Sequence, residues 1–225
     1  MAGIPREFAG EAPGAVASYD YFDIARGIGY EFYYLASTID AKILTTTNFY
    51  SVDILSAATH DYTTGDYVKV IEKDFDLSFI YPRTIGGLTR VTIPFKVHGV
   101  STNKEYSGKI TARVKKNSTE LVSNTGHVIT IVTTGTTNKA IFDVSTIDLD
   151  IPSTHFKAGD IFRLTIELWG KEHTTSSQGI YMFGHDPKDR SQSYLSTSGG
   201  KYFNFSGANE FTTVSSIDIP FKLDL

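Results

Sequence analysis

Ser216-Ile217-Asp218-Ile219-Pro220-Phe221-Lys222-Leu223-Asp224-Leu225 closes the chain and alternates apolar with polar residues. This period of two is typical of a strand with one buried face and one solvated face. The tetrapeptide Ile-Pro-Phe-Lys also occurs at residues 93–96, inside a second alternating stretch. Because a bare apolar edge aggregates and an untied terminus is disordered, such a strand needs a partner. We therefore predict that the chain ends inside a sheet.

The rest of the chain carries further stretches of the same kind, separated by turn-forming residues. We expect strands near residues 30–36, 43–56, 67–81, 88–99, 106–116, 127–133, 139–149, 161–169, 180–184, 202–205 and 215–225. No stretch sustains a helical period, although a short helix near residues 52–58 fits the residues there. About ten strands without helices predict an all-β fold, an antiparallel β-sandwich in jelly-roll or Greek-key order.

Two prolines interrupt the matching strands. In a jelly roll the first and last strands are neighbours, so residues 88–98 and 215–225 are expected to lie side by side. Pro94 and Pro220 have no amide donor, and such residues belong at an edge, a strand start or a bulge. We expect a bulge or a change of strand partner at each proline.

The N-terminal residues differ in composition from the rest. Residues 1–17 are rich in Gly, Pro and Ala and contain few large apolar side chains. This composition predicts an extended N-terminal arm, either a bland tail or a segment that orders against a neighbouring subunit. The β-sandwich domain is then expected over residues 18–225, with 18–66 as a candidate peripheral elaboration.

Composition excludes several classes of protein. The 225 residues include no Cys, which excludes disulfides and thiolate metal sites. The net charge is −4, and the 6 basic and 12 acidic residues of 1–86 place the acidic excess there. The N-terminal arm has no basic footprint, so we expect no direct contact with nucleic acid. No apolar stretch approaches the roughly 18 residues of a membrane span, so we expect no membrane contact.

No catalytic signature is present, and we assign no catalytic, cofactor-binding or metal-binding residue and no cofactor. Histidine spacings typical of metal sites, a nucleophile elbow and phosphate-binding glycine loops are all missing. Two pairs of acids on one strand face are candidate Ca²⁺ ligands, although two solvated carboxylates fit them better. These pairs are Asp74 with Asp76 and Asp148 with Asp150, and His60-Asp61 and His185-Asp186 are expected in surface loops.

Two surface features are candidates for binding. The outer face of the strand at 106–116 is basic, and it suits either docking of a second subunit or packing beside the acidic N-terminal strands. Its cations are Lys104, Lys109, Arg113, Lys115 and Lys116. Several aromatic residues are candidates for stacking on sugar rings, with edge or core packing as the alternative. They are Tyr62, Tyr181, Tyr194, Tyr202 and Trp169.

Four segments together resemble a group of virus and bacteriophage virion proteins of β-sandwich type. They are residues 86–99, the turn at 156–160 leading into 164–169, the loop at 185–190, and Ile219-Pro220-Phe221-Lys222. The resemblance implies a structural role in a particle, as a capsid, decoration or spike subunit, and it brings no catalytic residues. It departs from RNA-virus coat proteins, whose N-terminal arms are basic.

The sequence therefore predicts a non-enzymatic structural subunit that is located in a virion. Its expected partners are further copies of itself or other virion proteins, because assembly requires complementary surfaces and no chemistry. A glycan-binding β-sandwich module, for example on a tail fibre, is the alternative. A polysaccharide-active enzyme is the third reading, and it requires carboxylates that converge in a cleft with a raised pKa.

Overall fold

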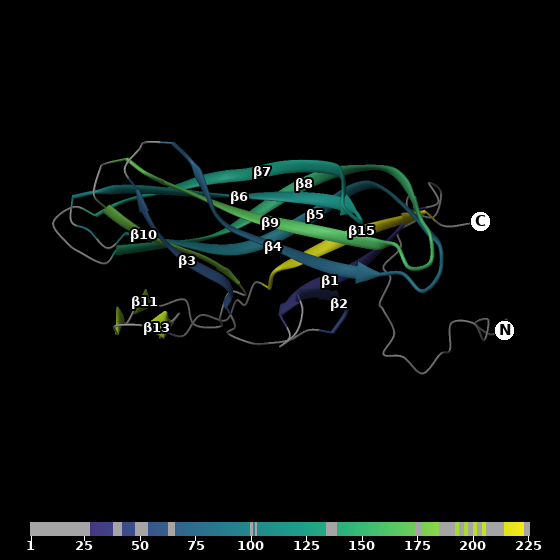
Figure 1. The fold of residues 1–225 in the computed structure, drawn as a ribbon, viewed down its shortest axis with the longest axis horizontal. Coiled ribbons are helices and arrows are strands. Elements are labelled where there is room, and N and C mark those ends of the chain that lie inside the picture. Colours follow the sequence, from purple (N-terminus) through teal and green to yellow (C-terminus); the bar gives the residue numbers. More distant parts are fainter. Residues whose placement is uncertain are drawn as a thin grey trace, which may run out of the picture.

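The computed structural model confirms the all-β fold (Figure 1). It describes residues 28–37, 42–47, 54–62, 66–99, 101, 103–133, 139–173, 177–184, 192–193, 196–197, 200–201, 204–205 and 214–222. The predicted arm, residues 1–17, lies outside these ranges, so its role stays a prediction. No helix that could span a membrane occurs among the described residues.

One large sheet contains most of the described strands. They are β1 (Ile28–Ser37), β2 (Lys42–Thr45), β3 (Ile54–Tyr62), β4 (Val68–Ser78), β5 (Arg83–Gly99), β6 (Glu105–Lys116), β7 (Thr119–Val132), β8 (Lys139–Phe156), β9 (Ile161–Glu172), β10 (Ser177–Gly184) and β15 (Ser216–Lys222). Two small ladders join β11 (Gln192–Ser193) to β14 (Asn204–Phe205) and β12 (Ser196–Thr197) to β13 (Gly200–Lys201).

The large sheet curls on itself into a half-barrel. Its order is β3-β10-β5-β15-β1-β2-β4-β9-β6-β7, and β8 pairs with the other edge of β5. Every described pairing in it is antiparallel except the bridge between β2 and β4, where Ile43 faces Asp76. The predicted β-sandwich is confirmed, and this parallel bridge is the one departure from antiparallel pairing among the described strands.

The C-terminal strand is central to one layer, as its alternation predicted. β15 lies between β1 and β5, so the two strands with the Ile-Pro-Phe-Lys sequence are neighbours. At Pro94 the edge of β5 changes partner, from β15 up to Thr92 to β10 from Phe95 onward. At Pro220 the β15–β5 register shifts between Asp218 and Phe221. Both prolines therefore stand at a change of partner or a bulge, as expected.

Three boundaries differ from the prediction. The segment considered for a short helix, residues 52–58, contributes to β3, and the strand expected at 139–149 continues as β8 as far as Phe156. Pro152 is tolerated there because, among the described strands, β8 has a backbone ladder on one side only. β7 begins at Thr119, well before the predicted residue 127, because Asn117 adopts a positive φ of 55° and turns β6 tightly back.

The two layers enclose one apolar core. Edge-to-face rings from opposite layers meet in it, such as Phe75 of β4 with Phe183 of β10 and Phe79 with Phe156 of β8. The layers come close at Gly108 of β6, where a Cβ atom would lie 2.4 Å from a methyl carbon of Val97. This packing buries the inward face of β6 and β9 and leaves their other face to solvent.

A cluster of polar groups ties the β6–β7 turn to the turn before β9. The side chain of Asn117 donates to Asp160 at 3.2 Å and accepts from the amide of Ile161 at 2.8 Å. Lys116 lies 3.0 Å from the Asp160 carboxylate. Hydrogen bonds from the Lys157 amide, Lys116 and Asn117 lower the pKa of Asp160 to about 2. These bonds fix one end of β6 relative to β9.

Loss of a buried side chain from β15 tests the central place of this strand. Ile217→Ala removes a side chain with 0% exposure and is expected to lower the free energy of unfolding by about 2–5 kcal/mol. Leu88→Ala, in the neighbouring strand and 54% exposed, is the control and is expected to change it by about 0.5 kcal/mol or less. Denaturant titration measures both, and equal losses would contradict the placement of β15.

Candidate functional site

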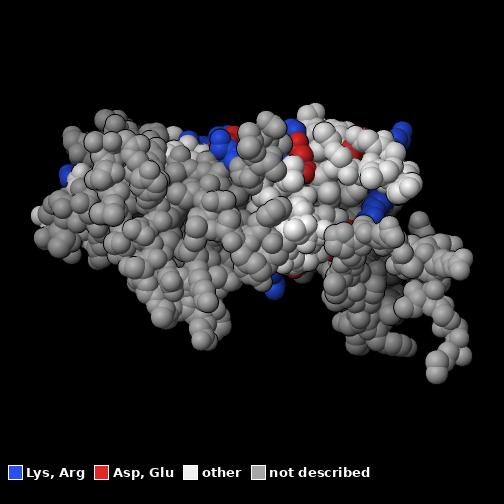
Figure 2. Space-filling view, turned by 90° about the horizontal axis from the view of Figure 1, so that it is seen from below, with Lys and Arg blue, Asp and Glu red and all other residues white. Residues whose placement is uncertain are grey.

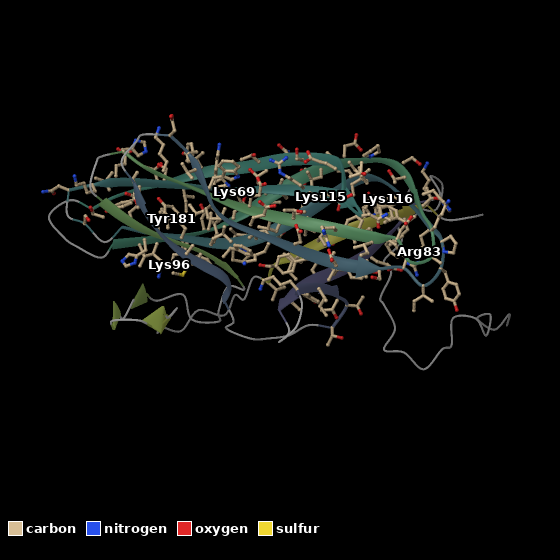
Figure 3. All side chains as sticks on the ribbon, viewed as in Figure 1. Lys69, Arg83, Lys96, Lys115, Lys116 and Tyr181 are labelled. Atoms are coloured by element: carbon tan, nitrogen blue, oxygen red, sulfur yellow. The ribbon has the colours of Figure 1, made fainter. Side chains whose placement is uncertain are left out.

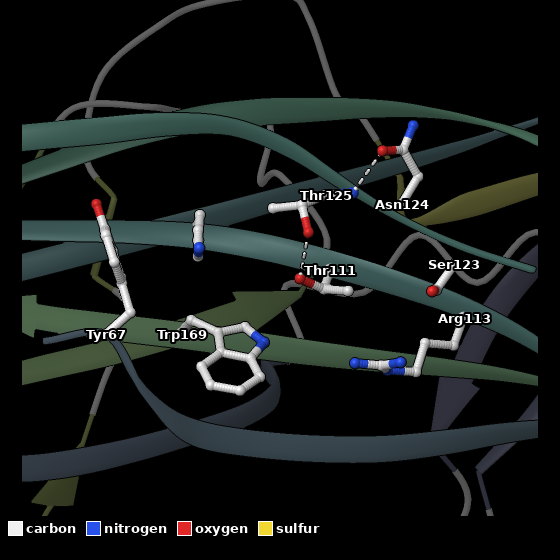
Figure 4. A pocket seen from close by; sticks show the side chains of 8 residues that line it. Tyr67, Thr111, Arg113, Ser123, Asn124, Thr125 and Trp169 are labelled. Atoms are coloured by element: carbon white, nitrogen blue, oxygen red, sulfur yellow. Dashed lines mark hydrogen bonds between the residues drawn. The ribbon is translucent and has the colours of Figure 1, made fainter.

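An open groove of about 500 Å³ lies on the outer face of the layer that contains β4, β9, β6 and β7. The inward residues of β6 and β9 fill the core, so their alternate residues form the floor of this groove. Figure 4 shows the indole of Trp169 nearly face-on, between Tyr67 and Arg113. The lining residues are Tyr67, Lys109, Thr111, Arg113, Ser123, Asn124, Thr125 and Trp169.

A buried carboxylate fixes the floor of the groove. Glu167 of β9 is only 4% exposed and accepts two hydrogen bonds from Arg113, at 3.0 and 3.2 Å. It also accepts one from the indole nitrogen of Trp169 at 3.0 Å, and the Lys69 ammonium lies 3.5 Å away. Charge-assisted bonds of this kind are strong and directional. The indole therefore has one preferred orientation.

Cations surround the ring of Tyr67 at one end of the groove. The ammonium of Lys109 lies 4.3 Å from the ring centroid and that of Lys171 lies 5.6 Å from it. In the β-ladders both Lys69 and Lys109 stand opposite Trp169, one on each side of β9. The aromatic floor is thus flanked by positive charge on two strands.

Hydroxyl and amide groups line the β7 side of the groove. Thr111 and Thr125 stand opposite each other and share a hydrogen bond of 2.8 Å between their hydroxyls (Figure 4). Each hydroxyl can make one donor and two acceptor contacts, so this pair retains capacity for a ligand. Asn124 donates to the carbonyl of Asp148 on β8, which holds this wall in place.

A serine of β6 and the histidine that follows β9 lie within hydrogen-bond distance of each other. Ser107 Oγ is 3.0 Å from His173 Nε2, and Glu105 Oε1 is 3.3 Å from the same nitrogen. In a catalytic triad the acid and the nucleophile bind opposite ring nitrogens. Ser107 is buried and also shares a hydrogen bond with Thr130 at 2.9 Å. This cluster does not have the geometry of a triad.

Two polar side chains are buried in β5, within the Lys-Val-His sequence that follows Phe95. Desolvation lowers the pKa of Lys96 to about 8 and that of His98 to about 4. Neither side chain lines the groove. The alternating pattern of this strand gave no sign that Lys96 would be buried, since it shares the polar phase with Thr92.

The candidate calcium pairs bind arginine in the structure. Arg163 makes two bonds of 2.7 Å to Asp76 and lies 3.5 Å from Asp74. Asp148 pairs with Arg90 at 2.9 Å. No group of three or more metal-ligating side chains occurs among the described residues. Three of the four candidate acids, Asp74, Asp76 and Asp148, therefore complete ion pairs with arginine.

The aromatic residues that were candidates for stacking on sugar rings lie in different parts of the structure. Trp169 is half-buried in the groove, whereas Tyr181 is fully buried and its hydroxyl donates to the carbonyl of Lys171. Tyr62 belongs to β3, and so do His60 and Asp61, which were expected in a loop. Tyr194, Tyr202 and the pair His185-Asp186 lie outside the described residues. Tyr67 was missed, because it precedes its strand and has no alternating pattern around it.

Two cations of the basic face of β6 form ion pairs within the chain. Arg113 pairs with Glu167 and Glu120, and Lys116 pairs with Asp160. These acids come from β7, β9 and a turn, not from the acidic first 86 residues. Figure 3 shows Lys69 and Lys116 well apart along the long axis. On the side of the molecule drawn in Figure 2, blue and red atoms lie side by side where described residues are visible.

Known proteins with a similar fold were found only among solved structures. No family model and no curated protein matches the sequence. The chain is similar to a CocE/NonD family hydrolase from Staphylococcus aureus, with 12% identity and a TM-score of 0.40 over 87% of this chain. An aminopeptidase from a marine sediment Thaumarchaeota archaeon has 9% identity and a TM-score of 0.40 over 86% of this chain. The chain spans 37% of the length of each of these enzymes.

A virus particle matches less well. The structure of infectious bursal disease virus, Gt strain, has 10% identity and a TM-score of 0.24, over 86% of this chain and 41% of that one. The prediction of a non-enzymatic virion structural subunit was therefore wrong on this comparison, since two hydrolytic enzymes score higher. The same two matches contradict the prediction that the chain is not an enzyme, although by themselves they show no activity of this chain.

None of these similarities assigns an activity or a substrate to the chain, because the identities and TM-scores are low. Localisation in a virion stays a prediction. Assembly with copies of itself and the lack of contact with nucleic acid stay predictions. The comparisons do not test the glycan-binding alternative either. The groove over Trp169 is the feature of the molecule that bears on function.

Replacing the buried carboxylate tests whether it organises the groove. Glu167→Gln weakens the bonds to Arg113, Trp169 and Lys69 and is expected to lower the free energy of unfolding by about 1–3 kcal/mol. Glu120→Gln removes the charge of the more exposed partner of Arg113 and is expected to cost less than about 1 kcal/mol. Thermal and denaturant unfolding measure both variants. A larger loss for Glu120→Gln would contradict the role given to Glu167.

Proposed function

We propose that this chain is a carbohydrate-binding β-sandwich, and that it binds a sugar ring in the groove over Trp169. The observation that carries this proposal is the indole held flat on the floor of the groove by its bond to Glu167. A ring fixed in this way offers an apolar face to one side of a sugar. Ordering it costs little on binding, because the structure has already oriented it.

The surroundings of the indole suit a polyhydroxylated ligand. Carbohydrate hydroxyls both donate and accept hydrogen bonds, and the hydroxyls of Thr111 and Thr125 can do the same. The side chain of Ser123 and the guanidinium of Arg113 line the same groove. The apolar floor with polar groups along one wall therefore matches the two faces of a sugar ring.

The open form of the groove indicates the size of the ligand. The groove follows the strands along the sheet face and is not an enclosed cavity. An oligosaccharide can lie across such a face, with one residue on the indole and the next ones in solvent. Affinity at a single open groove of this kind is expected to be modest, because only part of the ligand surface is buried.

Binding to immobilised and soluble oligosaccharides tests the proposal. A panel of neutral and acidic oligosaccharides is screened, and hits are measured by titration calorimetry on the purified chain. Trp169→Ala is expected to weaken binding of every hit at least tenfold, while Trp169→Phe retains a flat ring and a measurable part of the affinity. A tenfold change corresponds to about 1.4 kcal/mol.

Tyr81→Ala is the matched control, because this side chain is 73% exposed and does not line the groove. It is expected to leave affinity unchanged. The melting temperatures of all variants are compared with that of the unaltered chain to establish that each is folded. No binding anywhere in the panel, or binding that survives Trp169→Ala intact, would contradict the proposal.

A further inference from the structure

The cations around the groove are unequally neutralised. The ammonium of Lys69 contacts Glu72 and Glu167, and Arg113 contacts Glu167 and Glu120. Lys109 and Lys171 form no ion pair with any acid in the described part of the chain, and each instead lies near the ring of Tyr67. The positive charge that remains uncompensated is therefore concentrated at the Tyr67 end of the groove.

The strand register places these two lysines beside the indole. Lys109 stands directly opposite Trp169 in the β6–β9 ladder, where paired Cα atoms are about 4.5–5.5 Å apart. Lys171 follows Trp169 by two residues on β9 and points to the same face, about 7 Å along the strand. A ring that lies on the indole therefore has two ammonium groups near one of its edges.

We infer that the groove selects acidic saccharides, with a carboxylate of the sugar held by Lys109 and Lys171. This inference rests on the proposed function and names its ligand class. The ring of Tyr67 holds both ammonium groups near this end by cation–π attraction, which limits their freedom before a ligand arrives. A carboxylate placed there gains two charge-assisted hydrogen bonds.

Solvent exposure determines how this selectivity behaves. Both lysines are partly exposed, so their attraction to an anion is screened by salt. Preference for an acidic ligand over its neutral counterpart should therefore fall as ionic strength rises. The contact between a sugar ring and the indole does not depend on charged groups, so salt does not screen it. The affinity for a neutral ligand should therefore change little as ionic strength rises.

The experiment compares matched pairs of oligosaccharides. Tetramers of galacturonate, mannuronate and glucuronate-containing hyaluronate are each titrated against the chain beside their carboxyl-reduced forms. For at least one pair the acidic form is expected to bind at least tenfold more tightly at low salt. Lys109→Gln and Lys171→Gln together are expected to reduce that ratio to about one.

Lys115→Gln is the matched control, since it removes a cation from the same strand without lining the groove. It should leave the ratio as it is. Equal affinity for acidic and reduced forms, or a preference that survives loss of both lysines, would overturn this inference. If Trp169→Ala still abolished binding in that case, the proposed function would stand. Failure of all six ligands to bind would overturn both.

Discussion

Insertion of β15 between β1 and β5 is the constraint on which the rest of the fold depends. β5 and β1 have no described ladder with each other, and β15 pairs with one edge of each. From β1 the sheet continues through β2 and β4 to β9, β6 and β7. The layer that carries the groove is therefore positioned against the core by the last strand of the chain. Ile217 and Ile219, both fully buried, anchor that strand.

The groove in turn depends on one buried acid. A carboxylate with little exposure is costly unless it is paired and hydrogen-bonded, and Glu167 meets this need with groups from three strands. Its partners are side chains that also reach the surface. The bonds that stabilise Glu167 thus orient the indole and the guanidinium, whereas Lys109 and Lys171, beside Tyr67, form no ion pair with a described acid.

The alternation of apolar and polar residues predicted most strands of the layer that contains β15 and β5. It did not predict strands whose two faces are both exposed or both buried. The alternating apolar residues of β15 and β5 predicted both strands and their pairing. Pro94 and Pro220 predicted where a strand changes partner or its register shifts. The first half of β7 escaped prediction because most of its side chains are exposed, so residues 119–126 have no apolar phase. The extent of β8 was missed because Pro152 is typical of a loop, yet an edge strand tolerates it.

The site could be predicted only in part. Trp169 and the cations of β6 stood out as candidates, because the strand pattern of each segment placed them on an outer face. What the sequence did not contain was the register that sets Lys109 against Trp169, nor the position of Tyr67. Contacts between distant strands follow from the order of the whole sheet, and alternation within one strand does not report that order.

The most direct measurement uses the fluorescence of Trp169, which is the only tryptophan in the chain. Its emission reports the environment of the groove floor alone. Titration with an acidic oligosaccharide is expected to shift or quench this emission along a saturable curve, because the sugar replaces water over the indole. Saturable binding measured by calorimetry without any change in emission would contradict the account, since the ligand would then lie elsewhere.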